Sequence, residues 1–195
     1  MIKEFSDHLA HVIAVQTEDF ASEEVTSYGI ECLANELISD LILIAAGILL
    51  HQLVSVMVWL VTFTMVRIQI GGFHASTHAR CIFIGSIIGI LCIFLNSFWV
   101  EYSLFYSLLV FLFSLYTAGR YAPVVHPNHP VSAPLRRKAH FKALFFISVE
   151  GIAFFVLRAL NWKPCGAIPS ALLAAAGMCM LQVCLNRKNQ KPTHS

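Results

Sequence analysis

Long apolar runs are the feature that most constrains how this chain can fold. A helix needs about 20 predominantly apolar residues to cross the hydrocarbon core of a bilayer. The first run, 30–68, is too long for one span and just long enough for two, with a break near His51 and Gln52. The later runs cover 81–99, 102–119, 141–160 and 166–186. We therefore expect an all-α membrane protein with six transmembrane helices.

Composition excludes the other broad classes of protein. Hydrophobic residues make up 57% of the 195 residues and charged residues only 12%, whereas a soluble domain carries about 25% charged residues. The length allows one helical bundle without a separate soluble domain. We expect an acidic, amphipathic segment over 1–29, a six-span domain over 30–186 and a basic tail over 187–195.

The first 40 residues are acidic and begin with an amphipathic pattern. They hold nine acidic residues and a single lysine. Apolar residues fall at helical spacing over 2–15, which predicts an interfacial helix on the membrane surface. Thr17 or Ser22 could cap the helix that follows. The acidic surface is either simply solvated or a dock for basic groups.

The placement of lysine and arginine orients the predicted spans. With six spans, eleven of the thirteen basic residues lie on the side of the two termini. Positively charged loops face the cytoplasm in membrane proteins. We therefore expect a multi-pass membrane protein with both termini and the 67–80 and 120–141 loops in the cytoplasm.

Reactive side chains gather in the loop between the second and third predicted spans. Gly71 and Gly72 permit a tight bend or close approach of a substrate. His74 can act as a general base. Cys81 is a nucleophile once it is deprotonated, and Arg80 beside it would favour the thiolate. A straight helix would hold His74 and Cys81 about 10 Å apart along its axis, so a dyad requires a bend between them.

Spacing alone leaves other interpretations of this loop open. Cys81 could merely begin an apolar span, with His74 capping a loop. His74, His78 and Cys81 could share one helical face as zinc ligands, which would make the chain a zinc-dependent membrane protease. Polar residues at membrane depth also suit a small peptide transporter or export module.

Several sequence features together resemble the accessory gene regulator B family of bacterial quorum sensing. They are Arg67, the Gly71-Gly72-Phe73-His74-Ala75 segment and Cys81 seven residues after the histidine. Tyr121-Ala122-Pro123, the proline-rich 127–130 segment and the basic 136–138 segment extend the similarity. The resemblance also fits the size and the six-span pattern, so it covers nearly the whole chain.

The resemblance implies a cysteine endopeptidase embedded in the membrane. In this interpretation Cys81 is the nucleophile and His74 the base, and no cofactor, metal or nucleic acid takes part. The enzyme would cut the C-terminal tail from an autoinducing-peptide precursor and pass the acyl group to a side chain of that precursor, which closes a thiolactone or lactone ring. The resemblance also suggests a homodimer. Supporting or substrate-binding roles would fall to Arg67, Gly71, Gly72, Arg136, Arg137 and Lys138.

Other polar residues in the spans carry weaker expectations. Glu36 and Asp40 lie one helical turn apart and are either paired with an arginine or able to orient His74. Glu150 needs a polar partner inside the bundle. The remaining expectations are that Cys92, Cys179 and Cys184 are small buried hydrophobic residues, that no cysteine forms a disulfide, and that His126, His129 and His140 are solvated loop residues.

Overall fold

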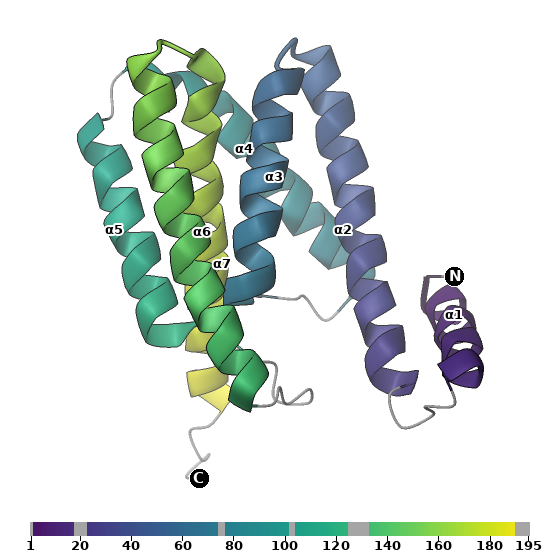
Figure 1. Cartoon of the computed structure of the whole chain (residues 1–195). Coiled ribbons are helices and arrows are strands. Elements are labelled where there is room, and N and C mark those ends of the chain that lie inside the picture. Colours follow the sequence, from purple (N-terminus) through teal and green to yellow (C-terminus); the bar gives the residue numbers. More distant parts are fainter. Residues whose placement is uncertain (1, 18–22, 74–76, 102–103, 125–132, 190–195) are drawn as a thin grey trace, which may run out of the picture.

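The computed structural model describes residues 2–17, 23–73, 77–101, 104–124 and 133–189, and they form a helical bundle without named strands (Figure 1). A short helix, α1, precedes six long helices, and a 3-10 turn, η2, joins the last two. The elements are α1 (Ile2–Thr17), α2 (Glu23–Leu49), α3 (Leu53–Ile70), α4 (His78–Glu101), α5 (Leu104–Tyr121), α6 (Ala133–Ala159), η2 (Lys163–Gly166) and α7 (Ala167–Asn189).

Six of these helices are long and apolar enough to cross a membrane, which confirms the expected fold class. The first apolar run divides at the expected place, where His51 adopts a positive φ of 54° between α2 and α3. Two helices begin earlier than their apolar runs. Glu23 and Glu24 extend α2, because acidic side chains are favourable in a first turn. The basic residues after Ala133 likewise continue α6 beyond the apolar run, because lysine and arginine favour helix.

Helix α7 forms the centre of the bundle and packs against α3, α4 and α5. Its small residues make this close packing possible, since small side chains let helix backbones approach. Ala171, Ala175 and Ala176 are buried within the chain, and so is Leu172. These three alanines therefore serve packing inside one copy of the protein, whereas Gly177 of the same helix is exposed.

Helix α1 lies against the first half of α2 through small side chains (Figure 1). Ser6, Ala10 and Ala14 recur every four residues and are buried. The Ser27 hydroxyl donates a hydrogen bond of 2.6 Å to Asp7 across this contact. Phe5 stays exposed, with other apolar residues of the helix, so α1 presents an apolar face outward, as the amphipathic pattern predicts.

The expected helix cap at Thr17 is wrong. Thr17 is the last residue of α1, and its hydroxyl donates to the Ile13 carbonyl one turn back. Its hydrogen-bonding capacity is therefore used inside α1. The alternative cap, Ser22, lies outside the described residues.

Two hydrogen bonds join polar side chains of neighbouring helices inside the bundle. Thr62 of α3 donates to the Glu150 carboxylate of α6 at 3.2 Å, which confirms that Glu150 has a polar partner. Asn96 of α4 donates to Ser55 of α3 at 2.8 Å. In a low-dielectric interior such pairs replace the water that these groups lose.

The structure corrects two expectations about the environment of single side chains. His140 is not a loop residue: it lies on α6, half-buried, with Nδ1 3.1 Å from the Ala122 carbonyl oxygen. Cys184 is exposed, because it faces outward from the last turns of α7, whereas Cys179 is buried and Cys92 half-buried. All six cysteines are free thiols, as expected. His126 and His129 lie outside the described residues.

Candidate active site

The loop after α3 is held against the rest of the bundle by its own backbone. Gly71 ends α3 with φ 71° and ψ −174°, a conformation that essentially only glycine adopts. It pairs with Val124 after α5, whose amide donates to the Ile70 carbonyl at 2.9 Å. The Phe73 amide donates to the Met178 carbonyl of α7 at 3.2 Å. The chain that leads toward His74 is therefore fixed on two sides.

Arg67 reinforces this loop from the last turn of α3. Its Nη2 donates to the Phe73 carbonyl at 3.2 Å and its Nη1 contacts the Met178 sulfur at 3.4 Å. The guanidinium carbon lies 5.3 Å from the centre of the Phe63 ring. Arg67 thus has a structural role, which is to hold the Gly71–Phe73 segment in place.

Cys81 faces α2 because of the residues that follow it on α4. A methyl group on Gly85 would lie 3.5 Å from Ser39 Oγ, and one on Gly89 would lie 2.5 Å from Leu43 Cδ1. The two glycines are four residues apart, which lets α2 approach α4 closely. Cys81 lies four residues before Gly85 and therefore on the same face of α4.

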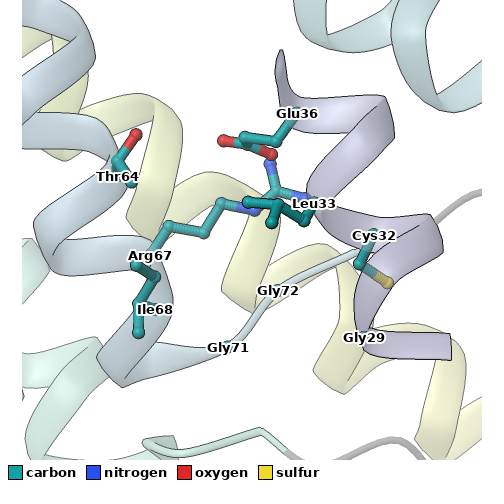
Figure 2. A pocket seen from close by; sticks show the side chains of 9 residues that line it. All are labelled: Gly29, Cys32, Leu33, Glu36, Thr64, Arg67, Ile68, Gly71 and Gly72. Atoms are coloured by element: carbon teal, nitrogen blue, oxygen red, sulfur yellow. The ribbon is translucent and has the colours of Figure 1, made fainter. Parts of the chain in front are cut away.

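A cleft opens between α2, α3 and the Gly71–Gly72 loop, with a volume of about 340 Å³. Figure 2 shows Cys32 and Glu36 of α2 on one wall and Arg67 of α3 on the other. A narrower pocket adjoins this cleft and shares Glu36 and Arg67 with it. Its other lining residues include Asn35, Ser39, Asp40 and Cys81. Cys81 therefore lines the narrow pocket, whose volume is only about 20 Å³, and not the cleft itself.

Charges of both signs meet in this cleft. The Glu36 carboxylate and the Arg67 side chain reach toward each other from opposite walls (Figure 2). Asp40 lies within electrostatic range of both groups. Arg67 is thus the basic residue that faces these carboxylates, and an arginine pair for them stays a prediction.

A second thiol stands near Cys81. Cys32 lines the cleft one turn before Glu36, hydrogen-bonds Tyr28 and lies within electrostatic range of Cys81 and Arg67. The cleft and the narrow pocket are therefore lined together by two cysteines, two acidic residues and one arginine. Such a set can hold a peptide backbone and supply a nucleophile for acyl transfer.

The structure brings together some of the predicted site residues and leaves others apart. Arg67, Gly71, Gly72 and Cys81 line the cleft or its narrow extension. Arg136, Arg137 and Lys138 do not: they are exposed on the first turns of α6. Arg137 and Lys138 line a separate hollow of about 530 Å³ with Ala133, Pro134 and Phe141. His74 lies outside the described residues.

On the α2 side of the site, sequence reasoning found Glu36 and Asp40 but missed Cys32, Asn35 and Ser39. Cys32, Asn35, Glu36 and Ser39 recur at intervals of three or four residues, and this spacing predicts a polar stripe on an otherwise apolar helix. The Gly85-x-x-x-Gly89 spacing also predicts a close contact of α4 with another span. Both signals are visible in the sequence, although neither says which helix is the partner.

The fold and the cleft define a multi-pass helical membrane protein with a cysteine site at one end of its bundle. The accessory gene regulator B family model matches residues 6–184, so the chain belongs to this family and to the system that processes quorum-sensing peptides. A putative AgrB-like protein of Clostridium perfringens strain SM101 is 24% identical over 193 residues, covering 92% of this chain and 90% of its own. A putative AgrB-like protein 2 of strain 13 is also 24% identical, over 195 residues with the same coverage. No solved structure matches.

Proposed function

We propose that the protein is a cysteine endopeptidase that cuts the C-terminal tail from an autoinducing-peptide precursor. The observation that supports this most is the position of Cys81, which lines a narrow pocket with Arg67. Arg67 also lines the adjoining cleft, together with the Gly71–Gly72 loop. Cys81 is the nucleophile. His74 follows that loop directly in the sequence and is the base that takes the thiol proton.

The cleft suits acyl transfer to the peptide's own side chain better than simple hydrolysis. The acyl-enzyme must last until a thiol or hydroxyl of the bound precursor attacks it and closes the ring. A bound peptide holds that group close to the thioester, which gives it a high effective concentration. Exposed apolar side chains surround the described helices, so the site adjoins lipid and its access to water is restricted.

The precursor reaches the site from the cytoplasmic leaflet in this proposal. The basic residues 136–138 lie in the first turns of α6. This helix starts at the same end of the bundle as α2 (Figure 1). They attract an acidic peptide tail through long-range electrostatics, since they do not line the cleft. The α2–α3 groove beside the cleft is apolar, with Leu37, Ile44 and Val61 in its wall, and it opens toward lipid.

Co-expression with a short precursor peptide, followed by mass analysis, tests this function. Cys81→Ser and His74→Ala should each abolish the cut product while the protein still inserts in the membrane. Cys184→Ser is the matched control, because it makes the same chemical change at an exposed thiol outside the cleft. A product that survives Cys81→Ser overturns the proposal. Loss of the product to chelators would indicate a zinc enzyme, and transport without a cut would indicate an export module.

A further inference from the structure

Positive charge accumulates at one end of the bundle, where α5 ends, α6 begins and α7 ends (Figure 1). Ten of the thirteen lysine and arginine residues follow Glu101, and the only acidic side chain after that residue is Glu150. Glu150 accepts the hydrogen bond from Thr62. It lies ten residues, or about 15 Å, farther along α6 than His140, which contacts the Ala122 carbonyl beside the end of α5. The three helices therefore supply no acidic side chain at their basic end.

Two arginines from different helices converge on one tyrosine at this end. Arg120 lies in the last turn of α5 and Arg187 in the last turn of α7. Each guanidinium carbon lies 5.6 Å from the centre of the Tyr121 ring. Both arginines are exposed, while Tyr121 is half-buried. The ring therefore anchors both charges at the surface of the bundle, and a contact of this kind adds no negative charge of its own.

The convergence of these arginines leaves a positive site that favours an anion. Within the described ranges, neither Arg120 nor Arg187 forms an ion pair with a carboxylate. The carboxyl ends of α5 and α7 each contribute only about half an elementary negative charge. The two arginines and the adjoining Lys188 exceed that charge. A ligand with a full negative charge is therefore stabilised between the ends of the two helices.

The surroundings of the site point to the phosphate of a membrane lipid. The planar fork of a guanidinium matches phosphate oxygens. On α5, the exposed side chains of Leu112 and Tyr116 precede Arg120 at intervals of one turn. On α7, the exposed side chain of Leu181 precedes Arg187. Both arginines thus follow apolar surface that faces lipid, and a tyrosine beside them suits the level of the headgroups.

We propose that Arg120 and Arg187 bind the phosphate of an anionic phospholipid, whose acyl chains lie along the exposed apolar surfaces of α5 and α7. Basic sites between transmembrane helices bind such headgroups. The site is separate from the cleft, which α2 and α3 line, so it does not depend on the proposed function. A bound lipid joins the ends of α5 and α7 and stabilises the folded bundle, because it binds the folded state alone.

Thermal unfolding of the full-length protein in a neutral detergent tests this site. Dioleoylphosphatidylglycerol is the anionic probe, and dioleoylphosphatidylcholine has the same chains without a net charge. Glycerol phosphate and a short polyglutamate peptide supply negative charge without acyl chains. The site variant is Arg120→Gln/Arg187→Gln, and the two single variants decide the question should the double variant fail to fold. Arg136→Gln/Lys138→Gln is the matched control, because it removes two exposed positive charges from the first turns of α6.

Phosphatidylglycerol should raise the unfolding midpoint of the wild type by about 5 °C or more relative to phosphatidylcholine. The site variants should lose more than about half of this shift, while the control variant keeps more than about half. A shift that the site variants retain, or that both sets of variants lose equally, would overturn the assignment, because the attraction would then be general to the basic end. The absence of a shift in the wild type would also overturn it, and so would a shift of equal size with glycerol phosphate or polyglutamate.

Discussion

Replacing Gly71 with alanine should disrupt the loop that leads from α3 toward the candidate base. Gly71 has φ 71° and ψ −174°, where an L-residue is strained by about 1–3 kcal/mol. A Cβ at this position would also collide with the Val124 carbonyl oxygen. Relieving that collision moves Val124 away from α3 and breaks the hydrogen bond from its amide to the Ile70 carbonyl. The loss of this hydrogen bond lowers the free energy of unfolding by about 0.5–1.5 kcal/mol more.

The combined cost is about 2–4 kcal/mol, which corresponds to a fall of roughly 5–10 °C in the midpoint of thermal unfolding for a chain of this size. Thermal unfolding of the detergent-solubilised protein measures this shift. Gly72→Ala is the matched control. Gly72 has no positive φ, and a methyl group there would meet Met178 Cβ at an ordinary 3.7 Å.

The two alanine variants should therefore separate clearly. Gly71→Ala should also lower precursor cleavage, because the displaced segment includes Phe73, which Arg67 holds. Gly72→Ala should keep the unfolding midpoint within about 2 °C of wild type. Equal midpoints for the two variants, or a larger fall for Gly72→Ala, would refute the assignment of the strained position to Gly71.

Three further outcomes test the packing and the charges. Gly89→Ala should cost about 1–3 kcal/mol by overpacking against Leu43, while Gly85→Ala should be tolerated, and thermal unfolding of both variants measures the difference. Glu150→Gln should keep the hydrogen bond from Thr62, whereas Glu150→Leu should leave the Thr62 hydroxyl without its acceptor. Because this bond contributes to stability, the glutamine variant should be the more stable of the two in detergent, and thermal unfolding measures the difference. Charge reversal over 136–138 should slow processing more at low salt than at high salt, and an effect independent of salt would exclude long-range attraction of the peptide.

The six-span architecture could be predicted because it follows from the transfer of apolar segments from water into lipid. Apolar runs of sufficient length must be helical in lipid, where every backbone group needs an internal hydrogen bond. The break at His51, the amphipathic α1 and the need of Glu150 for a partner follow from the same principle. The two early helix starts, at Glu23 and Ala133, lie in polar sequence where hydropathy carries no signal.

Sequence reasoning found the site residues that lie within one loop, and on α2 it found the charged residues Glu36 and Asp40 but missed the uncharged ones. Arg67, Gly71 and Cys81 fall within 15 residues, so their chemistry could be recognised together. Asn35 and Cys32 lie on α2, and only helix packing places them in the cleft. Conversely, the basic 136–138 segment looks like part of the site in the sequence but lies outside the cleft.

The sequence by itself determined the lipid environment, the number of spans, and the presence of a histidine and a cysteine close to a glycine pair. These properties depend on composition and short spacing, which need no knowledge of the partner helix. Tertiary structure decided that Cys81 shares a pocket with residues of α2, that Arg67 holds Phe73, and that Gly71 rather than Gly72 carries the strained backbone. Those facts depend on the register between helices distant in sequence, which is set by the close fit of Gly85 and Gly89 against α2.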